Sequence, residues 1–439
     1  MSVSKSGNDP SDSLVSSRAE IFWGIWAVVA AFGTYFCMYA FRKPFTAASF
    51  DETLLWGLDF KTILIISQVA GYMVSKFLGI KVISEMPPNR RALGILVLIS
   101  IAQIALLAFG LIPRPWNAIG LFFNGLALGM VFGLVLGYLE GRKLTEALTA
   151  GLCCSFILAD GVMKSVGTWL LGLGVIEDWM PFTAGLVFAL PLGISLLMLA
   201  VIPAPTLADQ AERSVRPPMN QADRWSLLNR YGLGLGLLVA MYLVVTIVRS
   251  VRADFAPEIW AGLGTEIDAG LFTRSEMLVA LGVLFANGAL ICIRNSRTAF
   301  FGSLVICLVG IGMMALTMLA WQADWIGGFP LMVMLGLGLY LPYVAIHTTV
   351  FERFLAMTRD RGNIGFLMYL ADSIGYLGYI GVMVARKSVS VEGDFIDFFV
   401  FICWACILIA ALCLGLGWWY FAIRCPAEKP VTVVTEGAG

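Results

Sequence analysis

Residues 21–42 read IFWGIWAVVAAFGTYFCMYAFR, an apolar run long enough to cross a bilayer that ends on an arginine. A second apolar run begins near Tyr231 and ends on Arg249, 207 residues after Arg42 (249 − 42). The residues before each arginine repeat at positions i, i+4 and i+7, which share one face of a helix. The repeated residues are Tyr35, Tyr39 and Arg42 in the first run and Tyr242, Thr246 and Arg249 in the second.

The two arginines need a physical reason. A guanidinium at bilayer depth costs about 2.5–3.5 kcal/mol on insertion scales. It stays charged at any accessible pH, and its planar fork of donors fits two oxygens of a phosphate or carboxylate. A bound anion is therefore the simplest explanation. The alternative is that each arginine pairs with a neighbouring carboxylate or helix end as a structural lock.

Composition predicts a membrane protein. Of 439 residues, 59% are hydrophobic and 13% charged, and the mean hydropathy is +0.86. These values lie outside the range of soluble globular proteins. The apolar runs are too long and too uniform for barrel strands, so we expect an all-α polytopic protein. Twelve runs reach spanning length, at residues 22–48, 60–84, 91–112, 116–139, 145–173, 181–203, 228–256, 274–293, 298–321, 326–350, 362–386 and 396–424.

A polar stretch after Pro205 divides the twelve runs into six and six. A second repeat supports two related halves, because Glu140 matches Glu352 and Leu158-Ala159-Asp160 matches Leu370-Ala371-Asp372 at a common offset of 212 (372 − 160). The expected organisation is a cytoplasmic tail (1–20), an N-terminal bundle (21–204), a cytoplasmic linker (205–229), a C-terminal bundle (230–424) and a cytoplasmic tail (425–439).

The basic residues outside the runs predict the orientation. With both termini in the cytoplasm, eighteen Lys and Arg residues fall inside and six outside, which the positive-inside rule favours. The first 20 residues show no cleavable signal pattern. We expect a multi-pass protein of the plasma membrane, or of the inner membrane in a Gram-negative cell. The six outside residues are Lys61, Arg114, Arg252, Arg274, Arg386 and Lys387.

Four short motifs lie in the first, second, seventh and eleventh runs. They are Met38-Tyr39-Ala40-Phe41-Arg42-Lys43-Pro44-Phe45, Gly71-Tyr72-Met73-Val74-Ser75-Lys76-Phe77, the spacing of Arg249, Asp254 and Pro257, and Gly375-Tyr376-Leu377-Gly378. These motifs are similar to those of the major facilitator superfamily and, within it, of the organophosphate:phosphate antiporters, which include glycerol-3-phosphate and hexose-6-phosphate transporters. The resemblance implies twelve transmembrane helices in two pseudo-symmetric six-helix bundles.

The resemblance also implies a substrate site. Arg42 and Arg249 would clamp a phosphate-like group from opposite halves, and five further side chains would line the same cavity: Lys76, Tyr35, Tyr39, Tyr72 and Tyr376. The chain departs from the family at three places that bear on the substrate. The fifth run carries Asp160 and Lys164 in place of a histidine, Thr246 replaces a tyrosine, and the loop after the second run keeps only Glu85 and Arg90-Arg91 of the superfamily signature.

Four charged residues are candidates for coupling or gating. Asp160 and Lys164 are one helical turn apart, so they either neutralise each other or respond together to the substrate. Asp372 has no cation one turn away and is the better candidate for proton binding. Asp254 is expected near the outer mouth as a gate or a structural partner. Lys43 must leave the face of Arg42, and either reaches an interface or serves the substrate.

Counting charges within the runs favours an anionic cargo. Five cations against Asp160 and Asp372 leave a surplus of three positive charges, with Asp254 set aside at a run end. The five cations are Arg42, Lys43, Lys76, Lys164 and Arg249.

These observations predict a secondary active transporter that moves a small organic anion by alternating access, with exchange of a phosphorylated metabolite for phosphate favoured. Alternatives are a proton-coupled carrier of a carboxylate or other solute, a transporter-like sensor, and a membrane enzyme, which the absence of a catalytic cluster disfavours. His347, the only histidine, is expected in the core rather than at a metal. The sequence has no P-loop. We expect no enzyme activity, cofactor, metal or nucleic-acid partner, and a monomer in the lipid bilayer.

Overall fold

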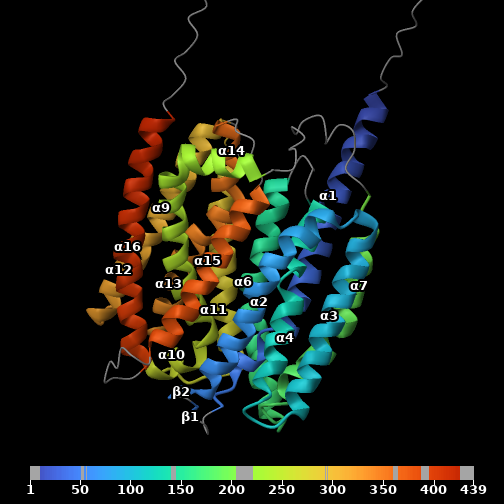
Figure 1. The fold of residues 1–439 in the computed structure, drawn as a ribbon, viewed down its shortest axis with the longest axis vertical. Coiled ribbons are helices and arrows are strands. Elements are labelled where there is room, and N and C mark those ends of the chain that lie inside the picture. The colour runs from blue at the N-terminus through green and yellow to red at the C-terminus, as the bar shows by residue number, and fades with distance from the viewer. Residues whose placement is uncertain are drawn as a thin grey trace, which may run out of the picture.

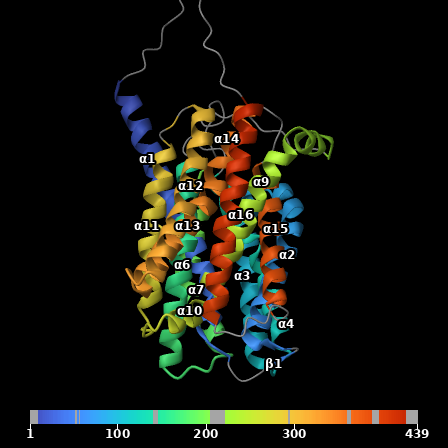
Figure 2. The same cartoon turned by 90° about the vertical axis from the view of Figure 1, so that its left-hand side faces the viewer.

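The computed structural model describes residues 10–50, 54–55, 57–139, 145–203, 221–291, 293, 295–358, 364–386 and 395–425. Long helices run side by side along the longest axis of the molecule, and the blue-to-green first half lies beside the yellow-to-red second half (Figure 1). After a quarter turn the helices still run along this axis, and the yellow-to-red half faces the viewer (Figure 2). The protein is an all-α polytopic membrane protein with two six-helix bundles, as predicted.

The first half contains seven α-helices, two of which are stacked pieces of one span. They are α1 (Pro10–Met38), α2 (Phe60–Glu85), α3 (Pro88–Leu111), α4 (Ala118–Leu128), α5 (Val131–Leu139), α6 (Thr145–Gly172) and α7 (Met180–Ala200). Two 3₁₀ turns, η1 (Tyr39–Phe41) and η2 (Pro44–Ala47), follow α1. A two-residue antiparallel ladder, β1 (Leu54–Leu55) with β2 (Leu58–Asp59), then leads into α2.

The second half begins with α9, which starts inside the predicted linker. Its elements are α9 (Gln221–Asp254), α10 (Ala256–Gly262), α11 (Leu271–Ile291), α12 (Ser296–Gln322), α13 (Gly328–Ala345), the π-helical turn η3 (Ile346–Val350), α14 (Phe351–Thr358), α15 (Ile364–Ala385) and α16 (Phe395–Arg424). Residues 1–9 of the predicted N-terminal tail, most of the predicted linker, most of the predicted C-terminal tail and Glu140 lie outside the described residues.

Eleven segments of the described chain are long and apolar enough to cross a membrane. Two of them are interrupted spans, Ala118–Leu139 through α4 and α5, and Gly328–Thr358 through α13, η3 and α14. Helix α11 carries Arg274 and Glu276 in its first turns, and its 21 residues make it the twelfth helix of membrane length. The predicted fold class is therefore confirmed.

The first span differs from the prediction of one continuous run over residues 22–48, because α1 ends at Met38. Pro44 has no amide proton to continue a helix and restricts the residue before it. The break frees carbonyl groups that water cannot reach, and side-chain amides bind them. Asn124 Nδ2 donates to Phe41 O at 2.9 Å, and Gln68 Nε2 donates to Arg42 O at 3.0 Å. These bonds hold the irregular turn that carries Arg42.

Glycines set how closely the helices approach. A Cβ at Gly125 of α4 would lie 2.0 Å from Gln68 O of α2, so only glycine fits at that crossing. Between the two halves, a Cβ at Gly161 of α6 would lie 2.5 Å from Phe272 O of α11. These glycines therefore pack α4 closely against α2 within the first half and α6 closely against α11 across the two halves.

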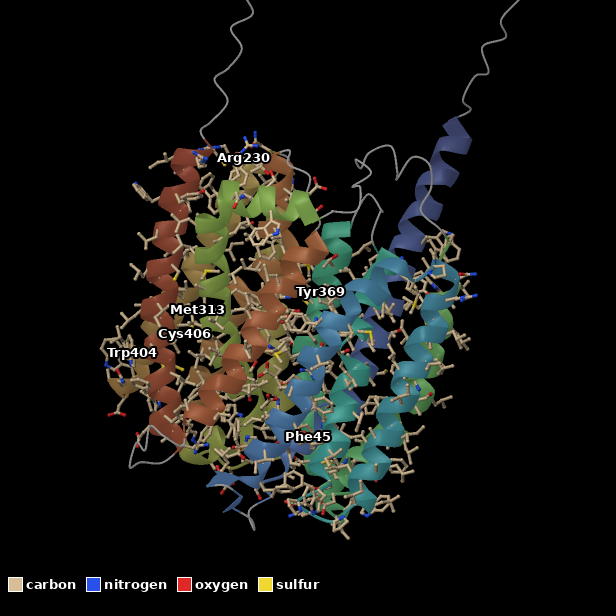
Figure 3. All side chains as sticks on the ribbon, viewed as in Figure 1. Phe45, Arg230, Met313, Tyr369, Trp404 and Cys406 are labelled. Atoms are coloured by element: carbon tan, nitrogen blue, oxygen red, sulfur yellow. The ribbon has the colours of Figure 1, made fainter. Side chains whose placement is uncertain are left out.

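The polarity of the molecule suits a bilayer. Large apolar side chains such as Leu190 and Phe285 project outward, while many buried side chains in the interior are charged. Figure 3 shows the side chains that leave the outer helices, including Trp404 at the edge of the second half. Apolar contact with lipid costs nothing, whereas interior charges need partners or ligands. The interior is therefore the place to look for function.

Candidate functional site

Arg42 and Arg249 line the same interior cavities. Arg42 follows η1 at the broken end of α1, and Arg249 lies on the last two turns of α9. Both are buried, at 7% and 8% exposed. Two small cavities are each lined by both arginines together with Tyr39 and Tyr376. The two halves of the protein thus present one guanidinium each to a shared space.

Each guanidinium lies against tyrosine rings. The Cζ atom of Arg42 is 4.1 Å from the ring centre of Tyr72, and that of Arg249 is 4.3 Å from the ring centre of Tyr343. A second tyrosine ring lies further from each, Tyr39 at 5.6 Å from Arg42 and Tyr340 at 5.8 Å from Arg249. Stacking occupies the faces of a guanidinium and leaves its edges, which carry the N–H donors, open to a ligand.

Neither arginine has a carboxylate within ion-pair distance among the residues that the structure describes. The Nε atoms of both are buried without a hydrogen-bond partner. Arg249 Nη2 donates to its neighbour, Ser250 Oγ, at 3.3 Å. A buried donor without an acceptor carries a full desolvation cost, so this pair of forks is unusual in a finished interior. The structural-lock alternative, in which each arginine pairs with a carboxylate, is not what the geometry shows.

Lys76 and Asp372 form an ion pair across the two halves. Lys76 Nζ of α2 donates to Asp372 Oδ2 of α15 at 2.8 Å. On the other oxygen, Oδ1, the Tyr242 hydroxyl donates at 2.5 Å and His347 Nε2 lies at 3.2 Å. As the sequence indicated, Asp372 has no cation on its own helix, but Lys76 on α2 supplies one. His347 is a hydrogen-bonded core residue as expected, with Nδ1 3.0 Å from Tyr343 O.

A second cross-half network contains Lys43, Asp160, Lys164 and Asp254. Asp160 and Lys164 form the predicted i, i+4 ion pair. Lys43 lies 3.3 Å from Asp160 Oδ1 and donates to Asp254 Oδ1 in the second half. The expectation that Lys43 reaches an interface is wrong, because it is 6% exposed and neutralises two buried carboxylates. Asp254 also accepts from the Tyr379 hydroxyl at 3.0 Å, so it is a buried structural partner in this conformation.

Two further buried cations were assigned from the sequence to outside loops. Lys61, at the start of α2, is 2% exposed and donates to Glu258 Oε1 at 2.5 Å. Arg252, within α9, is 1% exposed and lies 2.8 Å from Glu276 Oε1 of α11. Both residues belong to helices of the packed interior rather than to loops, Lys61 to α2 and Arg252 to α9.

The buried charges can now be counted again. Among the described residues, seven buried Lys and Arg side chains face four buried carboxylates, which leaves a surplus of three positive charges, because Glu258, the partner of Lys61, is only half-buried. Five of the seven cations each have a carboxylate partner. The two left over are Arg42 and Arg249. The paired cations are Lys43, Lys61, Lys76, Lys164 and Arg252.

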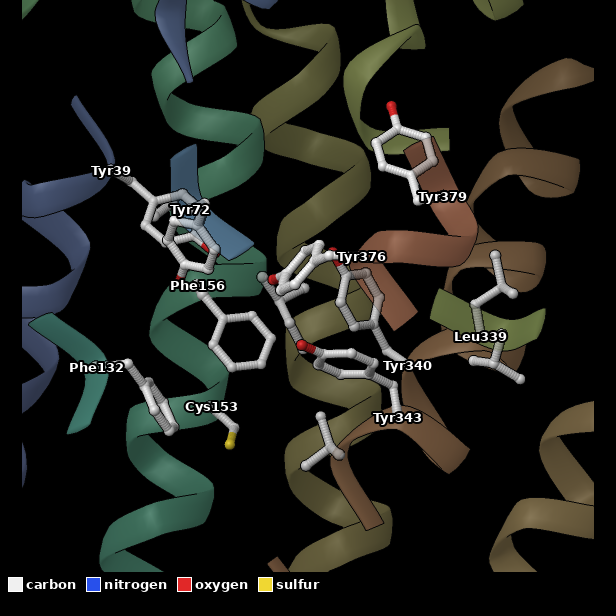
Figure 4. Packing of buried hydrophobic residues seen from close by; sticks show 14 of the residues in the cluster. Tyr39, Tyr72, Phe132, Cys153, Phe156, Leu339, Tyr340, Tyr343, Tyr376 and Tyr379 are labelled. Carbon is white, nitrogen blue, oxygen red and sulfur yellow. The ribbon is translucent and has the colours of Figure 1, made fainter. Parts of the chain in front are cut away.

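The structure brings the sequence-predicted substrate residues together. Arg42, Arg249, Lys76, Tyr35, Tyr39, Tyr72 and Tyr376 all line the two cavities. Of the predicted coupling residues, Asp160, Asp254 and Asp372 also line the cavities. Lys164 forms an ion pair with Asp160 behind the lining. Aromatic rings from both halves gather around this region (Figure 4).

Several lining residues escaped the sequence reasoning: Phe132, Phe156, Tyr340, Tyr343, His347 and Tyr379. The repeat could not reveal Tyr343, because the ring on Arg42 comes from α2 while the ring on Arg249 comes from α13. A search for tyrosines one turn apart in apolar runs would have found Tyr340 and Tyr343.

Comparisons with known proteins agree with this architecture. A model of a family of unknown function, DUF5690, matches residues 44–424, which is most of the chain. The chain belongs to this family. Among curated proteins, none matches the sequence.

Solved structures of transporters share the fold. A D-xylose–proton symporter aligns with a TM-score of 0.61 at 15% identity, covering 91% of this chain and 97% of that one. A major facilitator superfamily proton:xylose symporter bound to 6-bromo-6-deoxy-D-glucose aligns with a TM-score of 0.60 at 14% identity, covering 92% and 96%. A bacterial homologue of the iron transporter ferroportin, in an outward-facing state, gives 0.57 at 13% identity, covering 90% and 99%. This DUF5690 member therefore has the major facilitator fold.

Proposed function

We propose that the protein is a secondary transporter that moves a small organic anion by alternating access, and that the favoured cargo is a phosphorylated metabolite exchanged for phosphate. One observation carries the proposal. Two buried guanidiniums, one from each half, line the same space between the halves, and neither has a carboxylate partner in the described part of the chain. An oxyanion would satisfy the donors of both guanidiniums and offset their charge.

The stacking supports an oxyanion rather than a neutral solute. Tyr72 and Tyr343 cover one face of each guanidinium, so the forks can be approached along their edges. Tetrahedral phosphate can accept a pair of hydrogen bonds from each of two forks, because it has four oxygens. Planar carboxylate has only two oxygens and can satisfy one fork fully. The pair therefore favours phosphate esters over monocarboxylates.

Ion pairs between the halves support a mechanism in which the halves move relative to each other. Lys76–Asp372, Lys43–Asp254 and Lys61–Glu258 each join the first half to the second. Opening either end of the cavity requires some of these pairs to separate while others stay closed. We propose that residues 21–204 and 230–424 are the two moving units, with both termini in the cytoplasm and a monomer as the working form.

Flux through proteoliposomes tests the proposal. Vesicles loaded with phosphate should take up labelled phosphate or glycerol-3-phosphate, whereas vesicles without an internal anion should take up little. The matched control is Arg252→Lys, which keeps a buried cation beside Glu276 three residues from Arg249. Uptake of carboxylates driven only by a pH gradient would contradict phosphate exchange, and binding without any flux would identify a sensor.

A further inference from the structure

We propose that His347 binds a proton together with the substrate anion, so that each anion occupies the cavity with a proton on His347 Nε2. This inference rests on the proposed function and assigns the residue that links it to protons. Nε2 takes the proton from water on the side where the anion enters and returns it to water on the side where the anion leaves.

The local backbone fixes one nitrogen of the imidazole. His347 lies in η3, a π-helical turn, where amides bond to carbonyls five residues back. Carbonyls four residues back are then open to side-chain donors. His347 Nδ1 lies 3.0 Å from Tyr343 O, and Thr348 Oγ1 donates to Val344 O at 2.9 Å. Since a carbonyl only accepts, Nδ1 carries a proton and Nε2 is the nitrogen that gains or loses one.

The second nitrogen faces an acceptor. Nε2 lies 3.2 Å from Asp372 Oδ1, and that contact is a hydrogen bond only when Nε2 is protonated. Asp372 already receives Lys76 on Oδ2 and the Tyr242 hydroxyl on Oδ1. A carboxylate with an ammonium and a hydroxyl donor is held in its ionised form. Protonation in this cluster therefore falls on His347 rather than on Asp372.

The same cavity couples this proton to an anion. His347 lines the cavity with Lys76, Arg42 and Arg249, whose positive charges oppose a further proton on the imidazole. An anion bound between the arginines offsets that repulsion. Thermodynamic linkage makes the effect reciprocal. The anion strengthens proton binding as much as the proton strengthens anion binding.

The charged and titratable groups that face His347 come from five helices. They are Arg42, Tyr35 and Tyr39 from the α1 end, Lys76 and Tyr72 from α2, Tyr242 and Arg249 from α9, Tyr343 from α13, and Asp372 and Tyr376 from α15. Among the charged ones, Asp372 is the acid and the other three are cations. An added anion is thus the change that most favours the imidazolium.

The sequence makes a direct experiment possible because His347 is the only histidine. Protein labelled with ¹⁵N-histidine and purified without a polyhistidine tag gives a single imidazole signal in nuclear magnetic resonance. The chemical shifts of its two nitrogens distinguish the doubly protonated form from the neutral one. Inorganic phosphate is titrated at constant neutral pH, and calorimetry on the same sample measures phosphate binding independently.

The ratio of doubly protonated to neutral His347 should rise about 5-fold or more as phosphate saturates the site. In Asp372→Asn, which removes the fixed anion, the doubly protonated share should fall. Phosphate that binds by calorimetry without moving the ratio would overturn the inference and leave the anion site intact. Absence of any binding heat would overturn the anion site, and this inference with it. A His347→Gln variant should also lose the dependence of uptake on pH, and an unaltered profile would contradict the assignment.

Discussion

Arg249 and Arg252 lie one turn apart on the same helix and have opposite surroundings. Arg252 is bound by Glu276 at 2.8 Å and by Met332 O at 2.9 Å, and it fills the space left by Gly336. Arg249 has tyrosine rings and a neighbouring serine but no carboxylate. Arg252 is therefore fully bonded within the packed interior, whereas the N–H donors of Arg249 remain available to a ligand. Burial alone does not distinguish a structural arginine from a ligand-binding one, whereas the presence of a carboxylate partner does.

Breaking the ion pair between Arg252 and Glu276 should have the largest effect on stability. Arg252→Met leaves Glu276 buried and unpaired, and removal of one partner from a buried pair costs about 3–5 kcal/mol. We expect a large fall in thermal stability. The double variant Arg252→Met/Glu276→Met should recover most of it, because no charge is left unpaired. A double variant as unstable as the single one would refute the pairing.

Removing the charge of Arg42 or Arg249 should not lower stability. Arg42→Gln or Arg249→Gln removes a buried charge that has no carboxylate partner, so the unfolding temperature should stay unchanged or rise. Anion binding should be lost at the same time. A fall in stability as large as that of Arg252→Met would show that these arginines are structural.

A conservative change should separate charge from geometry. Arg42→Lys or Arg249→Lys keeps the charge but replaces the fork by a point donor. Loss of one charge-assisted hydrogen bond, worth about 1.5–3 kcal/mol, should weaken phosphate binding about 10- to 100-fold. Calorimetry of the purified variants measures this, with Arg252→Lys as the control that should bind like the unmodified protein. Equal phosphate affinity in Arg42→Lys, Arg249→Lys and Arg252→Lys would contradict recognition by the planar guanidiniums.

The stacked rings should contribute least. Tyr72→Leu or Tyr343→Leu removes a ring about 4 Å from a guanidinium. Cation–π contacts are worth about 0.5–2 kcal/mol, so we expect phosphate affinity to fall about 2- to 30-fold. Tyr72→Phe should be nearly silent, since the ring face is kept. A larger loss in Tyr72→Phe than in Tyr72→Leu would assign the role to the hydroxyl.

Much of the fold and part of the site could be predicted from the sequence. Long apolar runs determine a helical membrane protein, and the repeated spacing before Arg42 and Arg249 identified the two arginines that now line one space. The partners could not be predicted, because they are contacts between helices far apart in the chain. Lys76 finds Asp372 and Lys43 finds Asp254 only after the halves pack. The partner of Arg252 is of the same kind, because Glu276 lies on another helix, α11.

The most direct test of the anion site is to locate a heavy oxyanion. The protein is imaged at high resolution after addition of tungstate, a tetrahedral dianion that scatters strongly. We expect one strong peak between the guanidiniums of Arg42 and Arg249, and its loss in Arg249→Lys. A peak bound only by lysines elsewhere, or two guanidiniums still without a ligand at saturating tungstate, would contradict the account.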